Sequence, residues 1–311
     1  MNLITHSGTF HADDLIAYSI LSGVFPHYPL IRTRDDAALA NPPEGSVVFD
    51  VGLRYDPKAN LFDHHQKGGA GVRPNGVPYA ASGLVWKAYG KTYINNLAGF
   101  RGYEGFDVAA VHELVDRTFI QVIDALDCGA VDSHQALAGS PDVLFPELSL
   151  PVVLMGFNPV PLLDSEDPEA ITVKFREASE FCRQIVDRTV KRAISRELGR
   201  QFLEQADTGG PFIVLDQFVS WQDYALERER VLYVVFPSDN QWKCQAVPVA
   251  DGSFVSRKPL PAAWAGLDGK ALCDLTGVED AVFCANQRFI CGARSKAGAL
   301  RLCELALQQT A

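Results

Sequence analysis

Residues 3–14 read LITHSGTFHADD, and this stretch determines the fold that we expect for the first half of the chain. Leu3-Ile4-Thr5 is a short strand candidate, and apolar residues at helical spacing follow over residues 13–23. Gly8 allows a tight turn between them, because glycine adopts backbone conformations that a Cβ atom forbids. Further strand candidates lie at residues 30–33, 46–49 and 61–62. Strands that alternate with helices predict an α/β domain with a doubly wound, mostly parallel sheet.

The remainder of the chain predicts a long helix and a second domain, since 311 residues exceed what one compact core commonly uses. Residues 146–164 are rich in proline and apolar side chains and indicate a connector, and Ser165-Glu166-Asp167-Pro168 is typical of a helix start. Helical spacing continues to about Ala206. Strand-like runs follow at 212–215, 231–235 and 281–284, before a last helix at 296–308. We therefore predict a first domain at 1–150, a connector with a long linking helix at 151–210, and a smaller α/β domain at 211–311.

Composition and charge exclude several classes of protein. Hydrophobic residues make up 47% and charged residues 21%, as in ordinary globular proteins. No apolar stretch approaches the roughly 20 residues of a membrane span, and the N-terminus does not resemble a signal peptide, so we expect a cytoplasmic protein. The seven cysteines include no C-x-x-C pair, which favours reduced thiols over a disulfide framework or a zinc ribbon. A net charge of −10 excludes non-specific coating of duplex DNA, which requires many cationic contacts to phosphates.

Polar residues follow three of the four strand candidates directly, namely His6, Asp50 and the triplet Asp63-His64-His65. In open α/β sheets, ligands bind beyond the carboxyl ends of the strands. These side chains are therefore expected to converge on one crevice.

The loop after the first strand carries the strongest local signal, because His6, His11, Asp13 and Asp14 lie within nine residues. Carboxylate oxygens suit Mg²⁺ and Mn²⁺, and imidazole adds Mn²⁺, Zn²⁺ or Fe²⁺. The alternative is a polar loop whose aspartates cap a helix.

Two further segments add candidate ligands. Asp50 is a plausible bridge between two cations, although a lone aspartate after a strand is common. In an extended segment His64 and His65 would point in opposite directions, so one would bind metal and the other would contact substrate. Asp63 can hold a ligating imidazole through its far N–H.

The segment Asp124-Ala125-Leu126-Asp127 places two acids on one face at the end of a predicted helix. Acids at this end oppose the helix dipole, which argues for a compensating cation. A solvated final turn is the alternative.

Taken together, the segments resemble the DHH phosphoesterase superfamily and, more closely, its Myg (melanocyte proliferating gene) family, whose members have been described as 3′-to-5′ RNA exonucleases and metal-dependent hydrolases. The matching motifs are His6-x-Gly8-x-Phe10-His11-x-Asp13, Asp50-Val51-Gly52, Tyr55-Asp56-Pro57, Phe62-Asp63-His64-His65-Gln66, Ala81-Ser82-Gly83-Leu84-Val85-Trp86, RKPLPAAWAGL at 257–267 and FICGA at 289–293. The likeness covers most of the chain.

The resemblance implies a role for each matching position. The metal ligands would be His6, His11, Asp13, Asp50, His64 and Asp127. Asp50 would bridge the metals, Asp63 would stand behind His64, and His65 would face the phosphate. The catalytic set is then His65, Asp63 and Asp50. Cys128 stands where the family usually has asparagine, which leaves the choice between Asp124 and Asp127 open. Asp14 stands where the family more often has glutamate.

Cationic residues in both halves are candidates for binding the substrate phosphates. Lys67 and Arg73, in a glycine-rich loop, could stabilise charge beside the metals. Arg294 and Lys296 flank a predicted helix start, where anions bind well, and Arg257 and Lys258 could join them. A solvated basic helix face is the alternative for the second group.

The resemblance thus implies phosphodiester hydrolysis by water that two divalent cations activate, with Mn²⁺ ahead of Mg²⁺ or another ion. Two metals roughly 3.5–4 Å apart can supply the nucleophile and neutralise the leaving oxygen. The expected substrate is RNA, a short oligonucleotide or a nucleotide, attacked from the 3′ end. The alternatives are a phosphoesterase of small substrates such as pyrophosphate, and a metal-loaded scaffold without activity. A homodimer is left open, and no membrane partner is expected.

Overall fold

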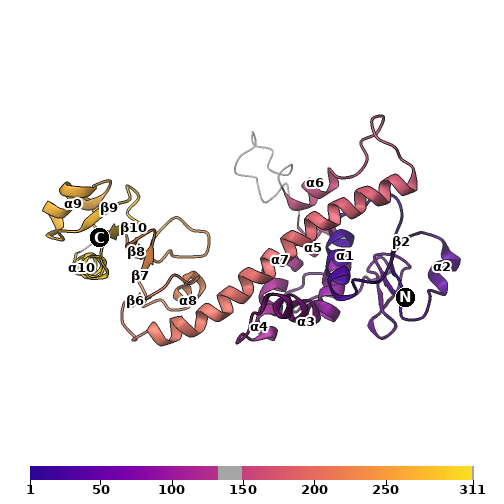
Figure 1. Ribbon diagram of the computed structural model, residues 1–311, viewed down its shortest axis with the longest axis horizontal. Helices are drawn as coiled ribbons and strands as arrows, with labels where there is room; N and C mark the ends of the chain where they lie inside the picture. The colour runs from indigo at the N-terminus through magenta and orange to yellow at the C-terminus, as the bar shows by residue number, and fades with distance from the viewer. Residues whose placement is uncertain (132–148, 310–311) are drawn as a thin grey trace. The chain divides into compact units, whose positions relative to one another are not determined.

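The computed structural model describes residues 1–131 and 149–309, so the first residues of the predicted connector (146–148) lie outside the described part. The chain divides into two compact units, Met1–Ala193 and Ile194–Ala311, and the division falls within the long helix α7 (Pro168–Ala206) (Figure 1). A long helix up to Ala206 was predicted from the sequence, and α7 confirms it. The predicted domain boundaries at residues 150 and 210 stay predictions.

The first unit contains a five-stranded sheet with the order β2-β1-β3-β5-β4. Its strands are β1 (Leu3–Thr5), β2 (Leu30–Arg32), β3 (Val47–Phe49), β4 (Tyr55–Asp56) and β5 (Leu61–Phe62). The pairs β1–β2, β1–β3 and β3–β5 are parallel, and the edge strand β4 runs antiparallel to β5. The sequence predicted the four parallel strands. It missed β4, whose two residues, Tyr55 and Asp56, form no apolar run like Leu61-Phe62 of β5.

Helices pack together beside this sheet: α1 (Ala12–Val24) contacts α3 (Ala81–Arg101), α5 (Gln121–Asp127) and α6 (Leu150–Met155). Helix α3 extends past the predicted end near residue 89. Gly90 lies within this helix, against the rings of Trp86 and His112, where a Cβ atom would have no room. Helix α4 (Val108–Val115) leads into α5 through a π-helical turn at Asp116–Ile120. The short α2 (Asp36–Ala40) follows β2.

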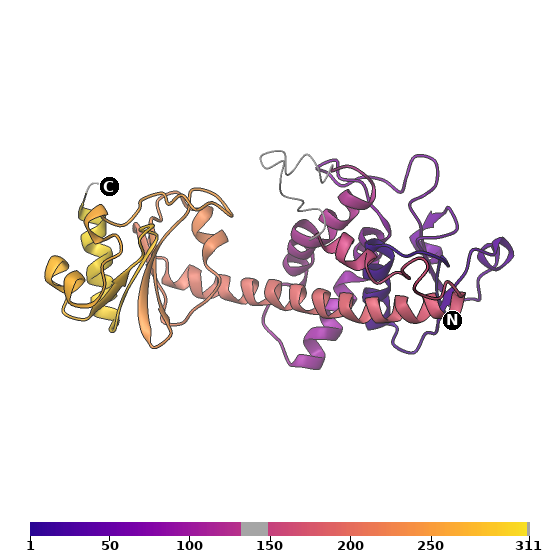
Figure 2. The same cartoon turned by 90° about the horizontal axis from the view of Figure 1, so that it is seen from above.

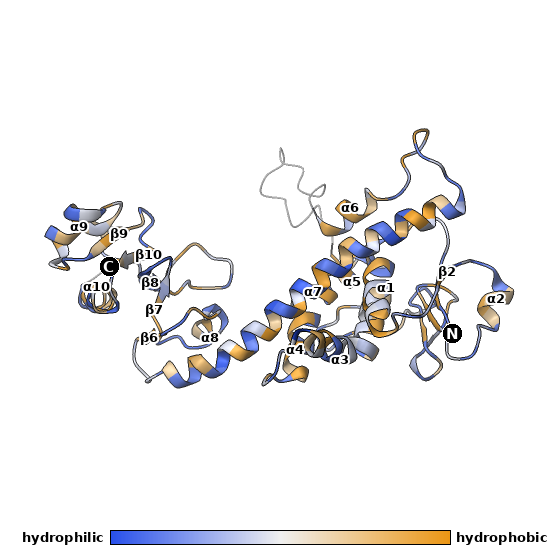
Figure 3. Ribbon diagram, viewed as in Figure 1, coloured by the Kyte–Doolittle hydropathy of each residue, from blue (hydrophilic) through white to orange (hydrophobic). Residues whose placement is uncertain are grey.

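The first part of α7 packs against the first unit. The ring of Phe175 meets that of Phe10 edge-on at 5.6 Å, and the Ser19 hydroxyl donates to the carbonyl of Ser179 at 2.9 Å. Figure 3 shows that polar and apolar segments alternate along α7. No helix in the described ranges combines the length and the apolar character that a membrane crossing requires.

The second unit is built on a sheet with the order β6-β7-β8-β10-β9, in which only β6 and β7 are parallel. Its strands are β6 (Phe212–Val214), β7 (Tyr233–Ser238), β8 (Gln241–Ala246), β9 (Ala281–Cys284) and β10 (Ile290–Ala293), and its helices are α8 (Gln222–Leu226), α9 (Gly269–Thr276) and α10 (Lys296–Gln308). Figure 2 shows α10 and α8 on opposite faces of this sheet. The sequence analysis missed β8, although Trp242, Cys244 and Ala246 alternate with polar residues, and it missed the four-residue β10, which contains Gly292.

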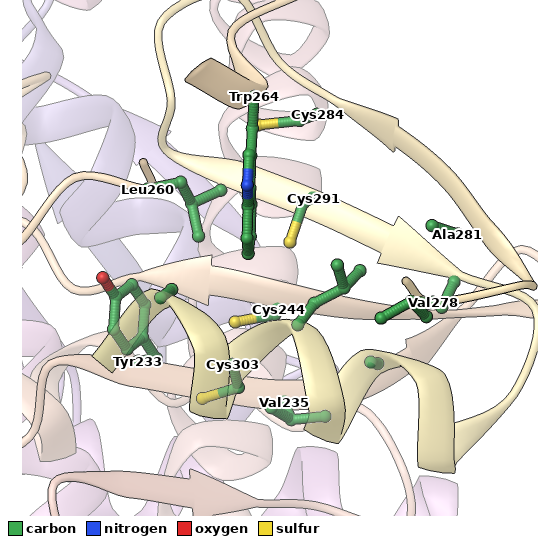
Figure 4. Close-up of a cluster of buried hydrophobic side chains, with 14 of the residues drawn as sticks. Tyr233, Val235, Cys244, Leu260, Trp264, Val278, Ala281, Cys284, Cys291 and Cys303 are labelled. Atoms are coloured by element: carbon green, nitrogen blue, oxygen red, sulfur yellow. The ribbon is translucent and has the colours of Figure 1, made fainter. Parts of the chain in front are cut away.

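Side chains of β7 alternate between two apolar cores, as the two-residue period of a strand requires. Tyr233 and Val235 belong to one core, whereas Val234 and Phe236 belong to the other. Figure 4 shows the first core, where Trp264 packs among several cysteine thiols. All seven cysteines are free thiols, as predicted.

Candidate metal centre

The polar residues that follow the strands of the first sheet meet at the carboxyl ends of its strands. His6 follows β1, Asp50 follows β3, and Asp63 follows β5. These three side chains are almost completely buried. Parallel pairing of β1, β3 and β5 therefore brings residues that are far apart in the sequence to one place.

Asp50 lies at the centre of this cluster and directs its two carboxylate oxygens to different histidines. Its Oδ2 lies 3.2 Å from Nε2 of His6, and its Oδ1 lies 3.3 Å from Nε2 of His64 and 3.5 Å from Nδ1 of His65. The backbone of Asp50 has a φ of 52°, a left-handed conformation that non-glycine residues rarely adopt. A carboxylate in this position can bridge two cations, one on each side.

The first side of the cluster is completed by Asp14, which the sequence analysis did not include among the ligands. Its Oδ2 lies 3.0 Å from Nε2 of His6, and its Oδ1 accepts a hydrogen bond from the backbone N–H of His11 at 2.9 Å. The side chain is fully buried. An aspartate in the first turn of a helix is usually a capping residue. The only sequence signal for a metal-binding role of Asp14 was the presence of histidines nearby.

The second side of the cluster surrounds His64. Its Nε2 lies 3.6 Å from Oδ2 of Asp13, and 3.4 Å from Oδ2 of Asp127. The Cys128 thiol lies 3.8 Å from the other ring nitrogen, Nδ1. Of the two acids left open by the sequence, Asp127 faces this group.

Asp124 faces away from the cluster and has a structural environment of its own. Its carboxylate accepts hydrogen bonds from the Ser82 hydroxyl at 2.5 Å and from the backbone N–H of Gly83 at 3.0 Å, and it pairs with Arg73 at 2.9 Å. Gly83 is required here, because a Cβ atom would overlap the carboxylate. This pairing also corrects the expectation for Arg73, which is buried between Asp116 and Asp124 instead of facing a phosphate.

Asp63 and the two histidines after it differ from the sequence prediction in two respects. Strand β5 ends at Phe62, so His64 and His65 do not alternate, and their ring centroids lie 4.1 Å apart. Asp63 supports His65 instead of His64: its Oδ1 accepts from Nδ1 of His65 at 2.8 Å. The same carboxylate accepts from the backbone N–H groups of His64, His65 and Leu53. Asp63 therefore connects the histidine pair to the loop after β3.

His11 and Asn158 lie at the edge of the cluster. The exposed His11 ring is 6.0 Å from the ring of His6 and lines the cavity described below. The Asn158 side chain accepts a hydrogen bond from the N–H of Phe10 at 3.0 Å and donates to its carbonyl at 2.9 Å. This pair of bonds fixes the loop that carries His6 and His11.

The charges of the cluster are not balanced within the protein. Within the described ranges, no hydrogen-bond partner is found for the buried atoms Asp13 Oδ1 and Oδ2, Asp14 Oδ2, Asp50 Oδ1 and His64 Nε2. Burial, together with Asp50 and Asp127, raises the pKa of Asp13 well above its usual range. Buried oxygens with no partner and several close carboxylates create a strong demand for positive charge.

The excess of negative charge also changes the pKa values of the histidines in the cluster. Burial lowers the pKa of His6, but the carboxylates of Asp14 and Asp50 outweigh it and raise that pKa to about 9. Burial likewise opposes the charged form of His64, yet Asp50 and Cys128 raise its pKa to about 10. The donor set of carboxylate oxygens and imidazole nitrogens fits divalent cations of the Mn²⁺ or Zn²⁺ type. A bound cation would take the place of the protons that the isolated cluster attracts.

A cavity of about 550 Å³ opens beside the cluster. Asp50, Asp63 and His65 form part of its wall, and Arg34 and Arg54 contribute cations that the sequence analysis did not select. Arg34 follows β2, where a single arginine carries no distinctive signal.

The remaining cations that the sequence predicted to contact substrate are either exposed or paired with other groups of the protein. Lys67 is exposed in the glycine-rich loop, and Arg294 is exposed in the second unit. Lys258 donates to the carbonyl of Leu307, and Lys296 pairs with Asp216. Arg257 donates to four backbone carbonyls, from Ala225, Leu226, Arg228 and Val231, which corrects its expected role: these bonds hold the fold together.

Comparison with known proteins places the chain in a family. A family model named MYG1_exonuc and described as "Uncharacterised protein family (UPF0160)" matches residues 2–307. The chain is 29% identical to the MYG1 exonuclease of Homo sapiens, over 98% of this chain and 85% of that protein. It is 27% identical to a MYG1 protein of Schizosaccharomyces pombe, over 99% and 97% of the two chains. Since the family match includes every residue of the buried cluster and nearly the whole sequence, the chain belongs to the MYG1_exonuc family.

Proposed function

We propose that this protein hydrolyses phosphodiester bonds in RNA or short oligonucleotides, as a 3′-to-5′ exonuclease that uses two divalent cations, with Mn²⁺ as the first candidate. The observation that carries the proposal is the position of Asp50, whose two oxygens face His6 on one side and His64 and His65 on the other. Relatives that are named MYG1 exonuclease support the reaction class.

Each residue would have a defined task. His6, Asp14 and Asp50 would hold one cation, and Asp13, Asp50, His64 and Asp127 would hold the other, with His11 at the rim. Bound divalent cations supply an acidified water and neutralise phosphate charge.

His65 differs from the other histidines because about half of its side chain is exposed. Asp63 holds its Nδ1, and this hydrogen bond is the largest cause that raises the pKa of His65. The opposite nitrogen, Nε2, can then donate a hydrogen bond to a phosphate oxygen or a proton to the leaving group. Lys67 and Arg294 remain proposed phosphate contacts.

A phosphoesterase of small substrates is the second candidate, because the cavity has the volume of a small-molecule site and the protein is acidic overall. A scaffold without activity is the third. We keep the cytoplasm as the proposed location and leave a homodimer open.

The test is hydrolysis of end-labelled RNA by protein stripped of metal and then supplied with Mn²⁺, beside Asp50→Asn and the exposed control Asp216→Asn. We expect metal-dependent shortening from the 3′ end that Asp50→Asn abolishes and Asp216→Asn retains. Cleavage of pyrophosphate or a nucleotide with intact RNA would select the second candidate. Metal binding without cleavage of any substrate would select the scaffold.

A further inference from the structure

The cavity beside the metal cluster has a second wall that the hydrolytic chemistry does not use. This wall comes from the segment after β2, from α2 and from the loop between β3 and β4. It contains two arginines, Arg34 and Arg54, and the apolar side chains of Leu39 and Leu53. Small-molecule sites combine apolar walls with a few polar groups in this way, in volumes of roughly 300–1,000 Å³.

Arg34 is held at the cavity by contacts that leave part of its guanidinium free. Its Nε donates to the carbonyl of Ser7 at 3.1 Å, and its Nη2 lies 3.1 Å from Nδ1 of His6. Within the described residues, Nη1 has no hydrogen-bond partner. An arginine anchored next to a metal ligand, with a free N–H group at a cavity, suits recognition of a phosphate.

Leu53 is unusual because it is both strained and exposed. Its φ is 56°, and 63% of the side chain is accessible although it is apolar. Its N–H donates to Oδ2 of Asp63 at 2.6 Å, so the carboxylate that supports His65 also holds this conformation. Backbone strain of this kind persists where the surrounding structure enforces it, and it concentrates at ligand sites.

Arg54 and Asp36 complete the wall. Arg54 donates from Nη2 to the carbonyl of Leu39 at 2.8 Å, which ties the strained loop to α2. Asp36 is an exposed acid of the same wall and can accept hydrogen bonds from sugar hydroxyls. A phosphate would therefore lie on the Arg34 side, next to the candidate metal ligand His6, and the sugar and base would lie toward Asp36, Leu39 and Leu53.

We propose that this cavity binds the terminal nucleotide of the substrate, with Arg34 on its phosphate and with Leu39 and Leu53 against its base. The inference rests on the proposed function for the choice of ligand, but binding can be measured without hydrolysis. It assigns Leu53 to recognition of the base and predicts release of single nucleotides.

The experiment is calorimetric titration of Mn²⁺-loaded protein with adenosine 5′-monophosphate and with ribose 5-phosphate, which lacks the base. Leu53→Ala should weaken binding of the nucleotide roughly fivefold to tenfold and leave the affinity for ribose 5-phosphate unchanged. Arg34→Ala should weaken both ligands roughly tenfold to hundredfold.

Two control variants match these changes. Leu162 is also an exposed leucine with positive φ, at 70°, and does not line the cavity, so Leu162→Ala should bind both ligands as wild type does. Arg101→Ala is the exposed arginine control. The manganese content of every variant is measured, so that a loss of metal is not mistaken for a loss of ligand contact.

The inference is overturned if the nucleotide does not bind, or if Leu53→Ala and Leu162→Ala behave alike. The proposed function fails separately, if RNA stays intact while the nucleotide still binds in the manner described.

Discussion

The two units bury very different interiors. In the first unit, four aspartates and two histidines are packed together near the ends of strands, and several of their buried atoms have no hydrogen-bond partner within the described residues. In the second unit, the core around Trp264 consists of aliphatic and aromatic side chains and cysteine thiols. An apolar core is stable by burial alone, whereas buried like charges are stable only with a counter-charge. We therefore expect bound cations to contribute more to the stability of the first unit than to that of the second.

The largest effect is expected from Asp14→Asn, because it removes a negative charge from the group that Asp14 forms with His6 and Asp50. We expect the hydrolysis rate to fall at least about 100-fold and the metal content to fall by about one ion per chain. The rate on RNA and elemental analysis of the purified protein measure this. Asp216→Asn in the second unit is the matched control. Unchanged metal content in Asp14→Asn would remove Asp14 from the cluster.

Removal of metal should destabilise the first unit and leave the stability of the second unit unchanged. A ligand present at 100 to 1,000 times its Kd stabilises the folded state by about 3–4 kcal/mol, and that stabilisation is lost on chelation. Hydrogen exchange should therefore accelerate in peptides within residues 1–193 and stay unchanged within residues 194–311. Equal acceleration of hydrogen exchange in both units would show that the stability of the first unit does not depend more on metal than that of the second.

A change confined to the second unit is Leu302→Ala, which opens a cavity in the core around Trp264. Leu302 is fully buried, and such truncations cost about 2–5 kcal/mol. Denaturant unfolding should show this loss while the metal content of the first unit remains that of wild type. The exposed Leu162→Ala is the control. Loss of metal from Leu302→Ala would contradict the independence of the two interiors.

A smaller effect is expected from Asn158→Ala, which removes both hydrogen bonds to the backbone of Phe10. Each bond contributes about 1 kcal/mol, so the loop that carries His6 and His11 should loosen without unfolding. Manganese affinity should fall roughly tenfold in a titration, while Asn95→Ala, on the exposed face of α3, should leave it unchanged. Wild-type affinity in Asn158→Ala would mean that the cluster holds the loop by itself.

Local patterns allowed the sequence to predict the four parallel strands of the first sheet and the long helix α7. Residues at the carboxyl ends of parallel strands could also be expected to meet, and His6, Asp50 and Asp63 do. The relation of Asp63 to the two histidines could not be predicted, because it depends on where β5 ends. Arg73 and Arg257 resembled phosphate contacts by charge alone. Their partners, Asp124 and four carbonyls distant in sequence, appear only in three dimensions.

The hydrogen bonds that Asp63 accepts have an evolutionary consequence. The Asp63 carboxylate accepts hydrogen bonds from the backbone N–H of Leu53 and from the imidazole of His65, so a substitution that shifts the backbone at Leu53 and a substitution of His65 act on a common partner. Residues that share a partner show non-additive effects, in contrast to distant independent sites. The histidine pair and the loop after β3 are therefore expected to be epistatic: a change in one alters which changes in the other are tolerated, and the two segments should diverge together among relatives.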